Sequence, residues 1–444
     1  MITVKVNGIG SEMQGVARLD DGRAVFIPFA LPEEEVSITL TRQKDRYALA
    51  KLERVLTPSL QRREPDCPYY GCCGGCQLRH ISYAQALEFK REKVCAALTR
   101  LGGLIEPTVL PALPSPQTDA YRNKAEFACA RGNMGVYREG SAEVIDIEGC
   151  RLQSDFANRI LGLVRRCKGA KALSGIVTRV NAAGEGMLIL CSHQKENGLS
   201  ALAKELCAGE PSLKSVYACF LKPRPAHALD GSCTLLLGQE RLNETLCDLT
   251  FSVSPQAFFQ VNRLQAERLY ETALSFAELR ETDSICDIYC GVGTITLCAA
   301  QRCKSVIGIE IVPEAISDAR KNAHTNRLSA KTQFLCADAA QAYPPLARKE
   351  QFSAVFVDPP RKGLDKAVVD ALIAAPTEKL IYVSCDPATL ARDIKLLTQS
   401  GTYRFVKAQP VDMFPGTSHV ETVCCLYHQK KDFISVPYEP KNAE

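Results

Sequence analysis

Four residues that could bind or react lie at the ends of apolar segments in the C-terminal half of the chain. They are Asp287, Glu310, Asp358 and Cys385, at or just after residues 284–288, 305–309, 354–357 and 380–383. If these segments are successive parallel strands, their carboxyl ends meet at the edge where open α/β sheets bind ligands. A single polar residue there is more often a strand cap. Four in register instead favour a site for binding and chemistry.

Cys385 and Glu421 are the candidate reactive groups. Cys385 lies in residues 384–387 (SCDP), where a loop at a strand end can expose the thiol and lower its pKa, making the thiolate a nucleophile. Glu421 opens an otherwise apolar terminal strand, and its carboxylate can act as a general base. Taken alone, Glu421 is better explained as a charge at a strand edge.

The stretch 287–293 (DIYCGVG) predicts a nucleotide-binding loop. An apolar strand runs into a turn with Gly291 and Gly293, and small residues in such a turn let a ligand approach the backbone. Glu310 follows about 20 residues later, where an acid can bind both hydroxyls of a ribose. The dinucleotide pattern requires another glycine at position 296, which is Thr296 here. This difference favours S-adenosylmethionine over NAD.

A methyl donor next to Cys385 would suit the alkylation of a pyrimidine at C5. Carbon 5 of uracil is a weak nucleophile, so a thiolate must first add to C6 and move electron density onto C5. Once C5 carries the methyl group, a base must remove its proton before the thiolate can leave. We therefore expect Cys385 to be the nucleophile and Glu421 to be the base.

The chain has 21 cysteines, more than a cytosolic enzyme needs. Most are expected to be small core residues, as in the apolar stretches around Cys129, Cys191, Cys219, Cys247 and Cys424. A disulfide framework is not expected in a long chain without an export signal. Four others have the spacing of a metal centre, for which zinc and a four-iron cluster are both candidates: Cys67, Cys73, Cys76 and Cys150. Cys72 is an extra thiol that could compete as a ligand or simply pack.

The elements that must position these residues fall into three expected domains. Residues 1–58 alternate apolar and polar positions between glycine turns, which predicts a small antiparallel barrel. Residues 59–250 form a central domain of mixed strands and helices, with an amphipathic helix over 83–100 that could pack on the catalytic domain and a proline-rich connection over 107–116. From residue 251 to 444, strand-loop-helix repeats predict a parallel sheet with helices on both faces.

The overall composition is that of a globular protein of 444 residues, with 46% apolar and 23% charged residues. No apolar run reaches the roughly 18 residues of a membrane helix, and the first residues resemble no secretory signal, so we expect a cytoplasmic location and no membrane partner. The net charge of +4 neither requires nor excludes nucleic acid. The basic residues of the barrel fit a solvated surface and an RNA-backbone contact about equally; they are Lys5, Arg18, Arg23, Arg42, Lys44, Arg46 and Lys51.

The sequence resembles the RNA uracil-5-methyltransferases over nearly the whole chain, and within them the ribosomal RNA branch that carries a barrel domain and an iron-sulfur cluster. The most specific segments are 254–262 (SPQAFFQVN), 287–293 (DIYCGVG), 358–364 (DPPRKGL), 384–390 (SCDPATL) and 419–422 (HVET). The resemblance implies an α/β fold. This would be a Rossmann-like S-adenosylmethionine methyltransferase domain with an N-terminal OB-like TRAM barrel and a central α+β domain that holds the cluster.

The resemblance also implies roles for individual residues. Cys385 would be the nucleophile and Glu421 the base. Asp338 would face the adenine of S-adenosylmethionine, and the barrel would bind RNA. Other contacts to the cofactor would come from Gln260, Tyr289, Glu310 and Asp358, beside the loop residues Asp287, Gly291 and Gly293. Cys67, Cys73, Cys76 and Cys150 would bind a [4Fe-4S] cluster. The expected substrate is 23S ribosomal RNA, with transfer RNA as the alternative, and no obligatory protein partner is implied.

Several alternatives stay open beside this interpretation. Adenine-N6 methyltransferases share the Asp358-Pro359-Pro360 pattern but continue with an aromatic residue, whereas Arg361 follows here. Methylation of uridine-54 in transfer RNA and cytosine-5 methylation use the same kind of cysteine. A non-catalytic RNA-binding protein would need neither Cys385 nor Glu421. A radical enzyme would need a three-cysteine cluster with an open iron, which a fourth cysteine, Cys150, would close.

Overall fold

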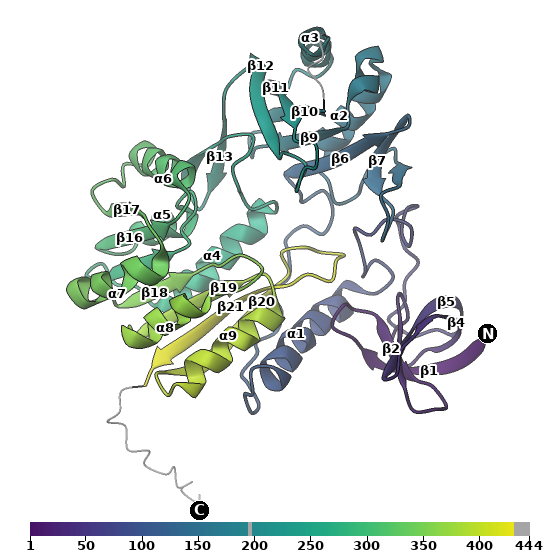
Figure 1. Cartoon of the computed structure of the whole chain (residues 1–444), viewed down its shortest axis with the longest axis horizontal. Helices are drawn as coiled ribbons and strands as arrows, with labels where there is room; N and C mark the ends of the chain where they lie inside the picture. The colour runs from purple at the N-terminus through teal and green to yellow at the C-terminus, as the bar shows by residue number, and fades with distance from the viewer. Residues whose placement is uncertain (194–197, 430–444) are drawn as a thin grey trace, which may run out of the picture.

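The computed structural model describes residues 1–193 and 198–429 of the 444-residue chain. Figure 1 shows three lobes, a purple barrel, a teal sheet with two helices, and a larger green and yellow sheet covered by helices. The parts of the expected central and C-terminal domains at residues 194–197 and 430–444 lie outside the described residues. Within the described ranges, no helix combines the length and apolar character needed to cross a membrane.

The N-terminal lobe is a closed five-stranded barrel in the order β1-β2-β3-β5-β4. Its strands are β1 (Ile2–Ile9), β2 (Gly15–Arg18), β3 (Ala24–Ile27), β4 (Glu35–Gln43) and β5 (Tyr47–Thr57). Alternate residues such as Val6, Val25 and Ile38 fill the interior. The expected all-antiparallel arrangement is wrong at one seam, where β3 and β5 run parallel. Five strands in a closed ring cannot all alternate in direction, so one parallel pair is unavoidable.

The central lobe is built on a seven-stranded sheet in the order β12-β11-β10-β9-β6-β7-β8. The strands are β6 (Lys124–Ala130), β7 (Asn133–Tyr137), β8 (Val144–Asp146), β9 (Gly175–Val180), β10 (Gly186–Ser192), β11 (Leu213–Leu221) and β12 (Gly231–Gly238). Helices α2 (Asp155–Arg166) and α3 (Leu199–Gly209) bury their apolar sides against the sheet. A separate hairpin, β13 (Leu242–Leu246) and β14 (Leu249–Val253), leads into the C-terminal lobe.

The C-terminal lobe has a seven-stranded sheet in the order β17-β16-β15-β18-β19-β21-β20. The first five strands in this order are parallel, and β21 runs antiparallel between β19 and β20. The strands are β15 (Ser284–Ile288), β16 (Ser305–Glu310), β17 (Thr332–Cys336), β18 (Ala354–Val357), β19 (Lys379–Ser384), β20 (Tyr403–Val411) and β21 (Glu421–His428). This topology gathers the ends of β15, β16, β18 and β19 at one edge.

Helices cover both faces of this sheet. One face packs on α4 (Arg263–Ala277), α5 (Thr294–Ala300) and α6 (Pro313–Thr325). The opposite face packs on α7 (Ala339–Glu350), α8 (Lys366–Ala374) and α9 (Pro387–Gln399). Both faces are therefore buried, and the middle strands consist almost wholly of apolar residues.

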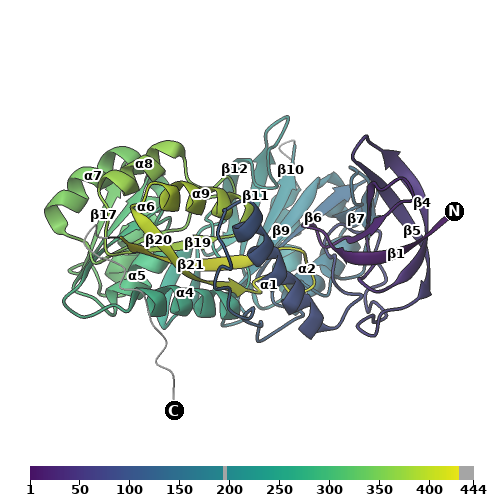
Figure 2. The same cartoon turned by 90° about the horizontal axis from the view of Figure 1, so that it is seen from below.

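The long helix α1 (Tyr83–Arg100) belongs physically to the C-terminal lobe. It lies beside α9, as Figure 2 shows, and its buried Val94 and Leu98 join the core under α8 and α9. The chain that follows runs along β20, where the Leu110 amide donates to the carbonyl of Ala408 at 2.9 Å. An N-terminal segment thus forms part of the lobe built by the last half of the chain.

Replacing Leu98 by alanine should therefore destabilise the C-terminal lobe by about 2–5 kcal/mol, because a fully buried leucine leaves a cavity between α1 and the sheet. Leu101→Ala is the matched control, since that side chain is 50% exposed. The measurement is the denaturant midpoint of each variant. Equal midpoints for both would contradict the packing of α1 described here.

Candidate active site

Cys385 and Glu421 lie side by side at the end of two paired strands. In the antiparallel pairing of β19 with β21, Ser384 is opposite Thr422. The next position along this pairing places Cys385, just after β19, beside Glu421, the first residue of β21. The two groups expected to act as nucleophile and base are separated by 36 positions in the sequence, and the insertion of β21 beside β19 brings them together.

The backbone around Cys385 is held on both sides. Ser384 Oγ accepts a hydrogen bond from the Asp386 amide at 3.1 Å and donates to its carbonyl at 3.0 Å. Asp386 then caps α9, because its carboxylate accepts from the amides of Ala388 and Thr389, both at 2.9 Å. Cys385 is thus fixed in a short turn between strand and helix, with its side chain half-buried.

The expectation of a lowered pKa for Cys385 is wrong. Burial raises the pKa of this thiol to about 11, and the carboxylates of Glu421 and Asp358 raise it further by repelling the thiolate. The positive charge of Arg361 acts in the opposite direction. An exposed strand-end loop would have favoured the thiolate, but this turn lies under neighbouring elements and among acids.

Glu421 is an acid with almost no access to water. Its side chain is 5% exposed, and burial raises its pKa to about 8, with a further increase from Asp358 and an opposing effect of Arg361. Among the described residues, no hydrogen-bond donor contributes to its pKa. A structural carboxylate at such a depth is normally paired or hydrogen-bonded. A strand-edge charge therefore explains Glu421 poorly.

The glycine loop after β15 adopts the backbone conformations that glycines allow. Gly291 and Gly293 have φ angles of 54° and 85°, and Tyr289 has a φ of 67°. A Cβ atom at Gly293 would lie 3.3 Å from the ring of Phe334, so a larger residue would combine strain with crowding. The chain can therefore turn sharply from β15 into α5 close to the end of β16.

Glu310, the last residue of β16, faces this loop. Its carboxylate accepts hydrogen bonds from the amides of Gly291 at 3.2 Å, Ile311 at 2.8 Å and Val312 at 3.0 Å. The carboxylate thereby joins the ends of two neighbouring parallel strands. This is the position expected for an acid that binds a ribose beside a glycine turn.

Asp287 and Asp358 are buried acids on adjacent strands. One oxygen of Asp287 accepts from Thr296 Oγ1 at 2.5 Å, and its other oxygen, Oδ1, is buried without a hydrogen-bond partner in the described part of the chain. Burial raises the pKa of both carboxyls to about 7. The negative charge of Asp358 raises the pKa of Asp287, Glu421 and Cys385 alike. Asp358 therefore lies between the glycine loop and the reactive pair.

Gln260 and Asp338 occupy different surroundings. Gln260 is buried, and its backbone carbonyl accepts from Asn123 Nδ2 of the central lobe at 3.0 Å. Asp338 is exposed and caps α7 by accepting from the Ala340 amide at 2.8 Å. Helix capping is a sufficient structural reason for Asp338, whereas Gln260 is at the junction of two lobes.

Arg361 is a residue of the site that was not predicted from the sequence. Its positive charge lowers the pKa of both Cys385 and Glu421. Its position three residues after Asp358, beyond the end of β18, was the available signal.

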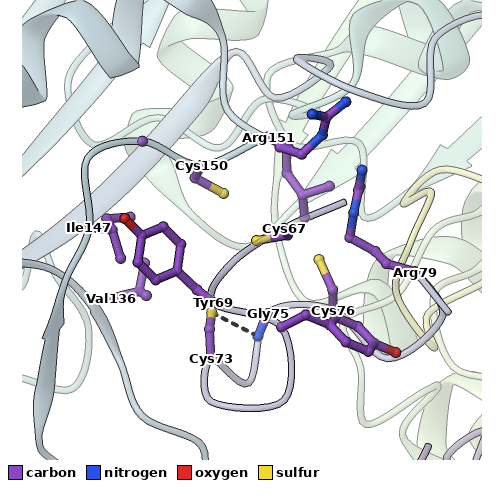
Figure 3. Close-up of a pocket in the computed structure, with 13 residues that line it drawn as sticks. Cys67, Tyr69, Cys73, Gly75, Cys76, Arg79, Val136, Ile147, Cys150 and Arg151 are labelled. Atoms are coloured by element: carbon purple, nitrogen blue, oxygen red, sulfur yellow. Dashed lines mark hydrogen bonds between the residues drawn. The ribbon is translucent and has the colours of Figure 1, made fainter. Parts of the chain in front are cut away.

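The four spaced cysteines meet at a second site. Cys67, Cys73, Cys76 and Cys150 line one cavity of about 40 Å³, and Figure 3 shows their thiols pointing into the same space. One water-sized sphere needs only about 10–15 Å³, so this space exceeds that of a single ion. Within residues 1–193 and 198–429, no three His, Cys, Asp or Glu side chains are close enough to hold one metal ion. Cys72 is exposed and does not line the cavity.

Positive side chains border this cysteine cavity. Arg79 pairs with Asp66 at 2.7 Å and Asp119 at 2.9 Å, and Arg151 pairs with the same two aspartates. Burial raises the pKa of Cys76 to about 12, so without a metal centre this thiol keeps its proton at neutral pH. Metal binding to thiols releases protons. The donor set and the bordering arginines therefore fit a centre that carries several thiolates.

The charges around Cys385 predict opposite effects of two variants on its alkylation by iodoacetamide. Arg361→Gln should slow the reaction at pH about 8, because loss of a positive charge raises the thiol pKa further. Glu421→Gln should accelerate it, because loss of a carboxylate lowers that pKa. The measurement is mass spectrometry of the Cys385 peptide, with the exposed Cys336 as internal reference. A wild-type rate that stays constant from pH about 8 to 10 would contradict the raised pKa.

Two family profiles match different parts of the chain. The profile of the tRNA (Uracil-5-)-methyltransferase family matches residues 234–430, and that of the TRAM domain matches residues 1–52. Two uncharacterized RNA methyltransferases, from Halalkalibacterium halodurans and Clostridium tetani, are each 35% identical to the chain and cover 96% of it, with 96% of their own length matched.

A solved structure is similar over the same length. The tRNA (uracil-54, C5)-methyltransferase of Pyrococcus abyssi, in complex with S-adenosyl-L-homocysteine, is 27% identical with a TM-score of 0.77. The match covers 96% of this chain and 100% of that one. The chain therefore belongs to the RNA (uracil-5-)-methyltransferases and carries a TRAM domain at its N-terminus.

Proposed function

We propose that this protein transfers a methyl group from S-adenosylmethionine to C5 of a uridine in RNA, with Cys385 as covalent nucleophile and Glu421 as base. The observation that carries the proposal is the pairing of β19 with β21, which sets the thiol and the buried carboxyl side by side. The S-adenosyl-L-homocysteine in the Pyrococcus abyssi enzyme supports the choice of cofactor.

The residues around the glycine loop fit S-adenosylmethionine. The unpartnered Oδ1 of Asp287 and the carboxylate of Glu310 offer acceptors beside the turn that carries Gly291 and Gly293. Gln260, Tyr289, Glu310 and Asp358 would hold the cofactor, with Asp338 near its adenine. When bound, S-adenosylmethionine supplies an electrophilic methyl group.

The chain's own groups act in two steps. The sulfur of Cys385 forms a bond to C6 of uracil, and the electron pair of the C5–C6 double bond makes C5 nucleophilic. After C5 carries the methyl group, Glu421 accepts the C5 proton, the double bond forms again and the C6–S bond breaks, releasing the thiolate. Because burial raises the pKa of Cys385 in the free protein, the thiol must give its proton to solvent before it adds to C6, and the positive charge of Arg361 favours the thiolate that results.

The RNA target is proposed to be 23S ribosomal RNA, as the sequence motifs imply. Transfer RNA is the second candidate, since the solved relative acts on uridine-54 of tRNA. Exposed Lys5, Arg42, Lys44 and Arg46 of the barrel would contact the phosphate backbone in either case. The target base must leave its stack to reach a half-buried thiol, which favours unpaired uridines. Mapping of 5-methyluridine in both RNA classes from a deletion strain distinguishes them.

A 5-fluorouridine transcript should become covalently attached to Cys385. The fluorine at C5 cannot be removed as a proton, so the reaction stops after methyl transfer with the C6–S bond intact. The measurement is a denaturation-resistant protein–RNA band whose digestion yields a Cys385 peptide. Cys385→Ala should give no band and no methylation, while Cys336→Ala should behave as wild type. A band retained in Cys385→Ala would refute the assignment of the nucleophile.

Glu421→Gln should accumulate the same covalent bond on natural RNA. Glutamine keeps the shape of the side chain but cannot accept the C5 proton, so addition and methyl transfer proceed while elimination stops. In the wild type, turnover below pH about 8 should rise with pH, because the base must lose its proton and its pKa is raised to about 8. Normal turnover of Glu421→Gln would assign the base elsewhere.

We also propose that Cys67, Cys73, Cys76 and Cys150 bind a [4Fe-4S] cluster. Support comes from the shared cavity, its volume and the bordering arginines. A tetrahedral zinc ion, which would hold the four sulfurs about 2.3 Å from one point, is the alternative. A four-iron cluster holds its thiolates farther apart.

Protein purified without air should therefore be brown, with absorbance near ~400 nm from thiolate-bound iron. Cys150→Ser should lose most of this absorbance. Cys72→Ser should keep it, because that side chain does not line the cavity. A colourless protein with one equivalent of zinc would overturn the cluster.

A further inference from the structure

The loop that ends at Glu421 has no regular secondary structure and depends on distant residues for its shape. It consists of residues 412–420, between β20 and β21, and is called the base loop below. Its anchors come from residues 77–93, 121 and 262. A catalytic group must be held to within about 0.5 Å of its working position. The position of Glu421 therefore depends on these contacts as well as on the pairing of β21 with its neighbouring strands.

Helix α1 anchors the beginning of the loop. Lys90 Nζ forms an ion pair with Asp412, and both side chains are 1% exposed. Lys90 also donates to the carbonyl of Phe414 at 3.0 Å, and the hydroxyl of Tyr83 donates to Asp412 Oδ2 at 2.9 Å. Buried ion pairs contribute little net stability but fix orientation when their hydrogen bonds are satisfied. The contacts of Lys90 and Tyr83 therefore fix the start of the base loop.

The cysteine-rich segment, residues 67–78, anchors the tip of the base loop. The amides of Gln77 and Leu78 both donate to the carbonyl of Gly416 at 3.0 Å. The side-chain oxygen of Gln77 accepts from the Ser418 amide at 3.1 Å, across 341 positions of sequence. A Cβ atom at Gly416 would lie only 3.9 Å from the sulfur of Cys76. The tip of the base loop therefore rests directly on the wall of the cysteine cavity.

Three further hydrogen bonds hold the base loop in place. Lys93 Nζ donates to the carbonyl of Ser418 at 3.1 Å, and the Tyr121 hydroxyl donates to that of Pro415 at the same distance. On the cofactor side, Asn262 Nδ2 donates to the carbonyl of Met413 at 3.0 Å. The loop thus joins the cysteine segment, α1 and the Gln260 motif to the glutamate.

We propose that Gln77 and Lys90 are positioning residues that hold the base loop, so that Glu421 meets the C5 proton after methyl transfer. This inference rests on the proposed function of Glu421. It implies that the cysteine-rich segment helps to position Glu421 for the elimination step. Addition of Cys385 to C6 does not need Glu421 as a proton acceptor. Loosening the contacts that hold the base loop should therefore slow the elimination step and leave the addition step unchanged.

The test compares Gln77→Ala with Gln77→Glu and with Gln301→Ala. Alanine removes the acceptor for the Ser418 amide, whereas glutamate retains an acceptor in the same place. Gln301 is exposed at the end of α5, so its replacement controls for a general loss of polar surface. Tyr83→Phe removes only the hydroxyl that contacts Asp412 and serves as a second variant that preserves the buried ion pair.

We expect kcat for Gln77→Ala to fall 10- to 100-fold, since displacement of a catalytic group by about 1 Å can cost ~10²-fold. The KM for S-adenosylmethionine should stay within twofold. The covalent adduct should accumulate on natural RNA, while adduct formation with 5-fluorouridine RNA keeps the wild-type rate. Gln77→Glu should restore turnover at least partly, and Tyr83→Phe should show a smaller version of the same pattern.

Unchanged turnover of Gln77→Ala and Tyr83→Phe would overturn the inference. Equal slowing of adduct formation and turnover, or loss of metal in parallel with activity, would also overturn it, because either result would indicate general damage. Failure of the proposed function itself is distinguishable. In that case the wild type would form no adduct with 5-fluorouridine RNA, and Glu421→Gln would accumulate none.

Discussion

The insertion of β21 between β19 and β20 determines which side chains meet at the candidate site. Its antiparallel register fixes Glu421 beside Cys385, and no local sequence rule could do so. The parallel strands bring the other acids to the same edge, each at its own strand end. In the proposed mechanism, the methyl acceptor, the methyl donor and the proton acceptor would therefore meet where the parallel part of the sheet joins its antiparallel part.

The raised pKa values at this edge of the sheet arise because several carboxyl groups are buried close together. Burial raises the pKa of Asp287 and Asp358 to about 7 and that of Glu421 to about 8, and the charge of Asp358 raises the pKa of Asp287 and Glu421 further. A thiol among such acids is protected from ionisation and oxidation until the environment changes. Arg361 is the charge that opposes this effect. Burial thus raises the pKa of both the proposed nucleophile, Cys385, and the proposed base, Glu421.

The sequence predicted much of this arrangement, because apolar runs mark strands and polar residues mark their ends. The helix expected over residues 83–100 is observed as α1, and the family and TRAM barrel are confirmed by the comparisons. The sequence did not predict the pKa direction of Cys385, which depends on neighbours from other strands. It did not reveal the partnership of Lys90 with Asp412 either, because 322 positions separate them. The roles of the cofactor and cysteine ligands stay predictions.

The place of β21 in the sheet also has a consequence for biosynthesis. It follows all other strands of the described chain, yet it lies inside the sheet, so the ribosome must deliver the residues of β21 before the sheet can close. Until then β19 has an unpaired edge next to Cys385, and contacts spanning more than 300 positions cannot form. Nascent chains therefore acquire Glu421, the proposed base, only after all other described strands have been made, and products truncated before β21 would lack it.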